Sequence, residues 1–151
     1  MDTDKVGGRD GSMLYVIILI VTFIWGINGL IDRQAITTGH PLEVNFITTF
    51  TMFIVASIYL MAAKVGGVPF HFHRNTILFA MTNGILVPTA YVVFLYALSR
   101  GSLTTVVTIT ASYPLVTFVL AVLLLNETVS PSKVAGMALI VLGLFLFVRQ
   151  T

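Results

Sequence analysis

Five long apolar runs constrain what this chain can fold into more than any other feature of its sequence. A helix needs about 20 predominantly apolar residues to cross the hydrocarbon core of a bilayer. Runs of this length cover residues 13–36, 42–63, 75–99, 101–126 and 129–148. Helices pair their own backbone groups, which lipid requires. The predicted fold class is therefore an all-α integral membrane protein, with a bundle of five transmembrane helices over residues 13–149.

The composition excludes several classes of protein. Hydrophobic residues make up 57% of the 151 residues and charged residues only 9%, whereas a soluble domain has about 25% charged residues. The net charge of +2 offers no basic surface for nucleic acid. The chain has no cysteine, so disulfides and thiolate chemistry are excluded. The expected surroundings are a lipid bilayer.

Residues 1–12, "MDTDKVGGRDGS", precede the first run. They are rich in glycine and polar residues, which predicts a disordered tail. The leader carries acidic as well as basic residues, and no small-residue cleavage site follows the run, so a signal peptide is not indicated. The first run is therefore interpreted as a membrane helix.

Lysine and arginine are distributed unevenly between the two sides of the predicted bundle. With the N-terminus inside, five basic residues lie on the inner side and three on the outer side. This bias favours a cytoplasmic N-terminus and an outside C-terminus in the cell membrane. Because the bias is small, insertion in both orientations stays open.

Polar and aromatic residues inside the first run could line a substrate cavity. Trp25, Gly26 and Gly29 share one side of a helix, with Asn28 at its margin. Trp25 lies near mid-span rather than at the interface that tryptophan favours. The alternative interpretation is packing, with Trp25 filling a gap between helices and the glycines allowing close approach. The two interpretations have about equal support.

The third run contains Pro88, which cannot donate a hydrogen bond to the carbonyl of Gly84 and should kink the helix. Tyr91 falls on the same face as these two residues. A structural kink packed by neighbouring helices is the favoured interpretation. A cavity wall that includes Tyr91 is the alternative.

The fourth run carries two polar sectors and a proline. Thr105, Thr108 and Ser112 cluster on one side of the predicted helix, and the second sector contains Thr110, Tyr113 and Thr117. Pro114 removes the hydrogen bond to the carbonyl of Thr110 and predicts a second kink. Threonine and serine can bond back to their own helix, but six such groups favour a substrate pathway along one sector. The first sector is the candidate.

The fifth run has small residues at helical spacing. Ser132, Gly136 and Gly143 lie on nearly one face and predict a helix-association face, toward another helix of this chain or a second copy. Just before the run, Ser130 followed by Pro131 predicts a helix N-cap.

Ionisable side chains give no catalytic or metal-binding pattern. Asp32, Glu43 and Glu127 lie near the ends of the runs, so no central carboxylate indicates proton coupling. His71 and His73 are two residues apart in a short connection without a third ligand nearby. No nucleophile–base pair or phosphate-binding glycine loop occurs. We therefore expect no enzymatic activity, no cofactor and no metal site.

The stretch from Tyr96 to Phe147 resembles the EamA domain of the drug/metabolite transporter superfamily. The resemblance is carried by "YALSRGS" and by "ASYPLVTFVLAVLLLNETVSPSKVAGMALIVLGL". The Ala-Leu pair, the central proline, the following glutamate and the glycines of the last helix are matched by Ala97, Leu98, Pro114, Glu127, Gly136 and Gly143. "FIWGIN" is similar to the Trp-Gly of the family's first helix, so the resemblance extends over nearly all of 14–148.

This resemblance implies one half of a transporter built as an inverted repeat, with the substrate site between two five-helix units. The chain has one such unit, so a partner is expected: a second copy, ideally antiparallel, or another half-size protein. The last helix is also similar to the dimerising helix of small multidrug resistance proteins. Those proteins have a membrane-buried glutamate in their first helix, which this sequence lacks. The arginine common near the start of the family's second helix is also missing.

The function expected from this resemblance is transport of a small metabolite, amino acid or drug by alternating access. The candidate pathway residues are Trp25, Asn28, Tyr91, Thr105, Thr108 and Ser112. Pro88 and Pro114 would kink their helices, and the helix segments could move about these kinks during alternating access. The alternative is a non-transporting membrane partner that stabilises or regulates another transporter.

Overall fold

The computed structural model describes residues 9–149 as a set of helices without strands. The helices are α1 (Arg9–Thr38), α2 (Pro41–Val65), α3 (Arg74–Arg100), α4 (Leu103–Thr110), α5 (Tyr113–Leu125) and α6 (Pro131–Val148). Five segments are long and apolar enough to cross a membrane, and one of them combines α4 and α5. This confirms the predicted all-α membrane architecture.

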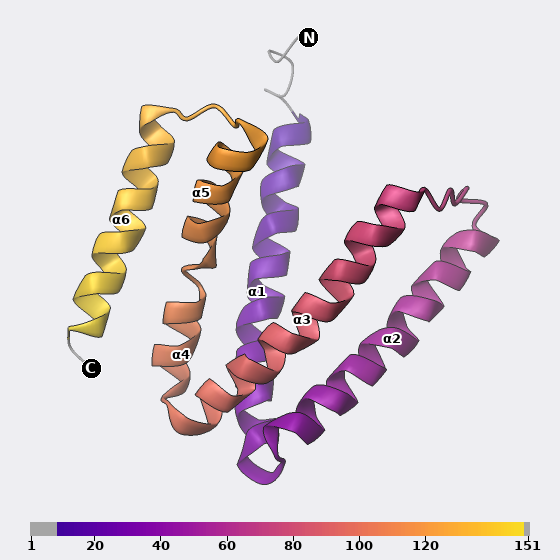
Figure 1. The fold of residues 1–151 in the computed structure, drawn as a ribbon, viewed down its shortest axis with the longest axis horizontal. Coiled ribbons are helices and arrows are strands. Elements are labelled where there is room, and N and C mark those ends of the chain that lie inside the picture. Colours follow the sequence, from indigo (N-terminus) through magenta and orange to yellow (C-terminus); the bar gives the residue numbers. More distant parts are fainter. Residues whose placement is uncertain (1–8, 150–151) are drawn as a thin grey trace.

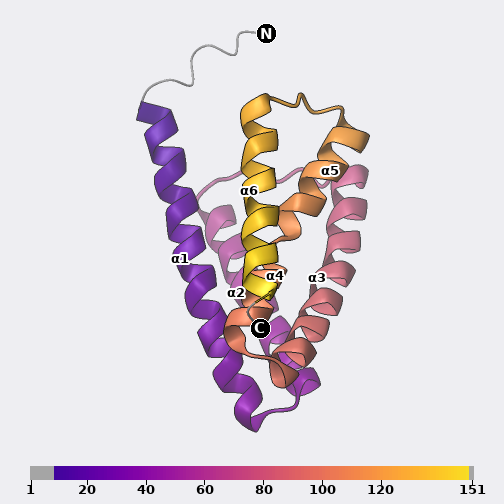
Figure 2. The same cartoon turned by 90° about the vertical axis from the view of Figure 1, so that its left-hand side faces the viewer.

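Successive spans run up and down, and four helix termini meet at one end of the molecule (Figures 1 and 2). Two short connections, after Thr38 and after Arg100, join α1 to α2 and α3 to α4 at this end. We call it the convergent end. Its buried side chains are Asp32, Pro41, Val44, Leu95 and Leu98. Packing within the chain is therefore concentrated where the helices converge.

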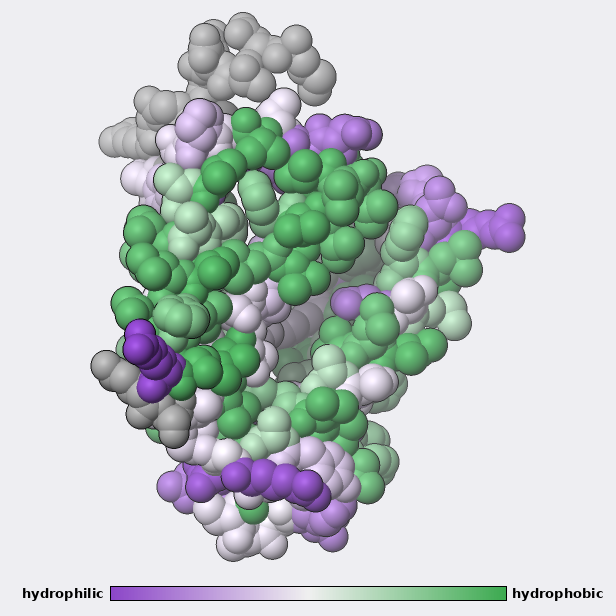
Figure 3. Space-filling view, turned by 60° about the vertical axis from the view of Figure 1, so that its left-hand side comes forward, coloured by the Kyte–Doolittle hydropathy of each residue, from purple (hydrophilic) through white to green (hydrophobic). Residues whose placement is uncertain are grey.

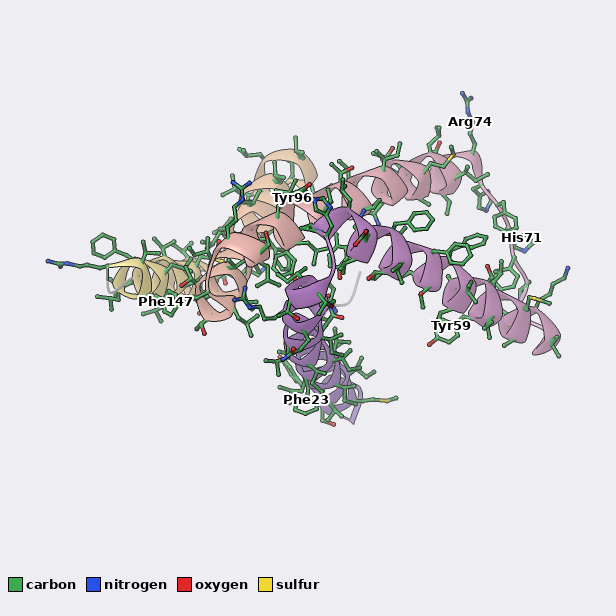
Figure 4. The ribbon with its side chains drawn as sticks, turned by 90° about the horizontal axis from the view of Figure 1, so that it is seen from below. Phe23, Tyr59, His71, Arg74, Tyr96 and Phe147 are labelled. Atoms are coloured by element: carbon green, nitrogen blue, oxygen red, sulfur yellow. The ribbon has the colours of Figure 1, made fainter. Side chains whose placement is uncertain are left out.

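Away from the convergent end, the helices diverge into three arms, which Figure 4 shows from below: α1, the α2–α3 hairpin, and the arm that ends in α6. None of the apolar windows that define the five spans is buried within the chain. Apolar side chains cover most of the face in Figure 3, which is hollowed between two lobes. These surfaces are suited to contact with lipid or with further helices.

Side chains cap the helices at the connections. Ser130 accepts a hydrogen bond from the backbone N–H of Lys133 at 3.3 Å, directly before Pro131. This confirms the N-cap predicted there. Ser102 caps α4 in the same way, and His40 forms a capping box with Glu43. At the convergent end, Ser102 and His40 thus accept hydrogen bonds from backbone donors that lipid could not satisfy.

The fourth span, Leu103–Leu125, is interrupted next to Pro114, the residue at which the sequence predicts a kink. The helix ends at Thr110 and a new helix begins at Tyr113. At the break, the Ser112 N–H bonds to the carbonyl of Ile109, and the Leu115 N–H bonds to that of Ser112. Pro114 lies in the first turn of α5, where its missing N–H leaves no bond unmade. In contrast, α3 is continuous across Pro88.

The other boundaries differ by a few residues from the sequence-based ones. The first helix begins at Arg9 and ends at Thr38, so residues 9–12 of the predicted tail are helical. The remainder of that tail, residues 1–8, lies outside the described residues. The last helix begins at Pro131 rather than at residue 129, because Ser130 caps it.

Candidate functional site

The angle between α1 and α2 holds a groove of about 420 Å³, which we call the α1–α2 groove. The residues that line it are Asn28, Ile31, Asp32, Ile47, Thr48, Thr51, Met52, Val55, Ala56 and Tyr59. Figure 4 shows Tyr59 projecting from α2 into this angle. Five of the ten side chains are polar, although every one lies within a membrane-spanning segment. The groove therefore offers a polar wall inside the membrane.

Asp32 lies at the end of the groove nearest to the convergent end and is only 4% exposed. Tyr91 of α3 donates its hydroxyl to Oδ1 of Asp32 at 2.5 Å. Asn28, one turn earlier in α1, donates its amide to Oδ2 at 3.2 Å. Residues four apart lie on the same helix face, so α1 presents both polar groups together. The Tyr91 bond fixes α3 against α1.

Arg33, the next residue, does not pair with this carboxyl group. Its Nη1 donates to the carbonyl of Leu98 at 2.5 Å and to that of Gly101 at 3.2 Å. The guanidinium thus satisfies carbonyls at the corner between α3 and α4. Within residues 12–149, the ion pair that forms joins Nζ of Lys133 to Oε1 of Glu127 at 2.6 Å. Both side chains are about half exposed. Asp32 therefore has two neutral hydrogen-bond donors and no cationic partner in the described part of the chain.

A second groove of about 280 Å³ adjoins the first near the convergent end. Both grooves are lined by Ile47 and Thr48. The second is also lined by Glu43, whose carboxylate is engaged in capping α2. The polar surface of α2 therefore continues from the α1–α2 groove toward the connection between α1 and α2.

The candidate pathway residues do not gather in one place. Asn28 lines the α1–α2 groove, and Tyr91 donates a hydrogen bond to Asp32, which also lines this groove. Trp25 is 69% exposed and lines neither groove. The structure thus associates only two of the six candidates with Asp32.

The polar sectors of the fourth span differ in burial. Thr105, Thr108 and Ser112 are half-buried, whereas Thr110 and Tyr113 are exposed. Ser112 donates its hydroxyl to the carbonyl of Ile109 at 2.6 Å, and Thr105 accepts one from Ser102 at 2.7 Å. These two hydroxyls are satisfied locally. The first sector faces the inside of the chain but lines neither groove.

The glycines in the predicted contact faces have different surroundings. A Cβ at Gly29 would lie 3.4 Å from Cγ2 of Val107, so α1 and α4 approach closely there. A Cβ at Gly26, Gly136 or Gly143 would meet no atom of the described residues within 4 Å. The face formed by Ser132, Gly136 and Gly143 thus remains open within the chain.

The central residue of this site, Asp32, is not indicated by the apolar pattern of its own run. Asp32 lies near the end of the first run, and Thr51 stands between two apolar residues of the second run. The spacing of Asn28 and Asp32 was the available signal, because amide and carboxyl groups four residues apart share a helix face. The contact with Tyr91 joins residues 59 apart in the sequence, and no local pattern indicates such a contact.

Five helices long and apolar enough to cross a membrane, with a partly polar groove between the first two, define a multi-pass membrane protein. The EamA-like transporter family matches residues 12–149, so the chain belongs to this family of membrane transporters. Comparisons with curated proteins and with solved structures gave no match.

Proposed function

We propose that this protein transports a small metabolite, amino acid or drug, and that the α1–α2 groove forms part of its substrate site. The observation that carries the proposal is the row of polar side chains from Asp32 to Tyr59 along membrane-spanning helices. Polar groups at that depth are unfavourable in lipid and occur where they face a cavity or one another. Membership of a transporter family supports the same conclusion.

The proposed transporter contains a second five-helix unit. The groove opens between diverging helices, so another unit would be needed to enclose a substrate there. The open face of Ser132, Gly136 and Gly143 offers a surface on which helices can pack closely. Inverted repeats place substrate sites between two such units. The favoured assembly is an antiparallel homodimer, with a heterodimer as the alternative.

Alternating access in this assembly would use the interrupted fourth span. The break at Ser112 leaves α4 and α5 as separate segments within one span, and helix-terminal residues can absorb the backbone changes of a hinge. Thr105, Thr108 and Ser112 would line the pathway from this side, while Trp25 would face the second unit. The proposed orientation keeps the N-terminus in the cytoplasm.

Uptake into proteoliposomes tests the proposed function. The purified protein is reconstituted and supplied with labelled amino acids, amines and other small metabolites. Saturable uptake of at least one solute is expected. Met52→Trp, which fills the groove, should abolish that uptake, whereas Met61→Trp on the same helix should preserve it, because Met61 is 69% exposed and outside the groove lining.

Two results would contradict the proposal. Uptake at the rate of protein-free liposomes across the whole panel would favour a non-transporting partner of another transporter. Equal uptake by the two tryptophan variants would place the substrate pathway elsewhere.

A further inference from the structure

Asp32 is the buried charged side chain of the described residues, and it faces a groove rather than a cation. Both of its hydrogen-bond donors, the Tyr91 hydroxyl and the Asn28 amide, are neutral. An ionised carboxylate withdrawn from water is strongly unfavourable unless an opposite charge accompanies it. The described residues therefore supply no positive charge to accompany an ionised Asp32.

Two cations of the described residues have partners other than Asp32. Arg33 donates to the carbonyls of Leu98 and Gly101. Lys133 is paired with Glu127 at the connection between α5 and α6. A carboxylate has about four lone-pair positions, and Asp32 uses one on each oxygen for the bonds described. Acceptor capacity therefore remains for a ligand.

The rest of the groove suits an apolar body with a few polar contacts. Met52, Val55 and Ala56 form a continuous apolar strip on α2, and the side chains of Thr48, Thr51 and Tyr59 accompany it. The lining on α2 extends from Ile47 to Tyr59, which is about 18 Å at 1.5 Å per residue. A volume of about 420 Å³ is within the usual range for small-molecule sites.

We propose that the α1–α2 groove binds a small organic cation, with its ammonium group on Asp32 and its apolar body along α2. Asn28 and Tyr91 are positioning residues, since each holds one carboxylate oxygen. This inference rests on the proposed function, because it names the substrate class of the same groove.

Equilibrium binding to the purified protein in lipid nanodiscs tests the proposal. The probes are radiolabelled phenethylamine and 2-phenylethanol, which have similar size but differ in charge. The wild-type protein is expected to bind the amine at least about tenfold more tightly, as hydrogen bonds to charged groups contribute in this range. Asp32→Asn should remove this preference. Glu127→Gln should retain it, because Glu127 lies half-exposed outside the groove.

The following results would overturn the inference: equal affinity of the wild type for amine and alcohol, no saturable binding of the amine, or an unchanged preference in Asp32→Asn. If Asp32→Asn does not fold, Met52→Trp decides instead, since it narrows the groove and keeps the carboxylate. Amine affinity unchanged by Met52→Trp would also overturn the inference.

Proteoliposome uptake separates this inference from the proposed function. Uptake of neutral or anionic solutes without uptake of amines contradicts the cation site and leaves transport standing. Charge-selective amine binding without uptake of any solute supports the cation site and contradicts transport.

Discussion

At the residue scale, one carboxyl group organises the contact between α1 and α3. Asp32 is almost fully buried and receives the Tyr91 hydroxyl from the neighbouring span. A hydrogen bond to a charged group contributes more to stability than one between neutral groups. The same residue thus links two helices and lines the groove.

Replacing Tyr91 by phenylalanine tests this contact. We expect Tyr91→Phe to lower the free energy of unfolding by about 1–3 kcal/mol, because the carboxyl group loses one of its two donors. Thermal unfolding in detergent measures the effect as a lower melting temperature. Tyr113→Phe is the matched control, since that side chain is 61% exposed. Equal melting temperatures for the two variants would show that the Asp32 bond does not stabilise the protein.

At the element scale, α1 contacts its neighbours through different faces. Asn28 and Asp32 face the groove and α3, whereas Gly29 faces Val107 of α4. A Cβ added at Gly29 would already be in van der Waals contact with Val107, so the space there admits little more than a methyl group. Gly26, one turn earlier, has no such neighbour among the described residues.

The two glycines form a matched pair for mutagenesis. Gly29→Leu should destabilise the protein by about 1–3 kcal/mol, because the new side chain enters a packed contact. Gly26→Leu should have a smaller effect, since open space surrounds that position. Thermal unfolding of both variants provides the comparison. A larger loss at Gly26 than at Gly29 would contradict the described packing of α1 on α4.

The sequence predicts the spans well because each apolar run carries its own signal for a membrane helix. The position at which a helix breaks depends on the surrounding backbone as well as on the proline itself. Pro114 indicates a lost hydrogen bond, but whether a helix bends or restarts depends on how Ser112 and Ala111 arrange the neighbouring backbone. The burial of Asp32 is likewise set by α3, so a residue near the end of a run became the centre of the site.

At the scale of the whole molecule, the described chain packs tightly only at its convergent end. The three arms leave apolar surface and the α1–α2 groove open. Open space lies beside Gly136 and Gly143 of α6 among residues 12–149. These features support the proposed assembly with a second unit. The proposed antiparallel arrangement specifies which residues of the two α6 helices lie opposite each other.

Cysteine cross-linking tests that arrangement, because the chain contains no native cysteine. In an antiparallel pair of α6 helices, Gly136→Cys in one copy should form a disulfide with Gly143→Cys in the other when the two variants are mixed. In a parallel pair, each variant should cross-link with itself. Val134→Cys, about 160° away around the helix, should form no disulfide between copies. Cross-linking of Val134→Cys alone would contradict the proposed face.

The proposed function requires that the α1–α2 groove is an aqueous substrate pathway rather than a surface covered by lipid. The most direct measurement is the modification of single cysteines in reconstituted protein by a membrane-impermeant thiol reagent. Thr51 lines the groove, whereas Phe53, two residues later on α2, lies outside the lining and is 68% exposed. We predict that Thr51→Cys is modified and that Phe53→Cys is not. Modification of Phe53→Cys with protection of Thr51→Cys would show that the α1–α2 groove is not an aqueous pathway.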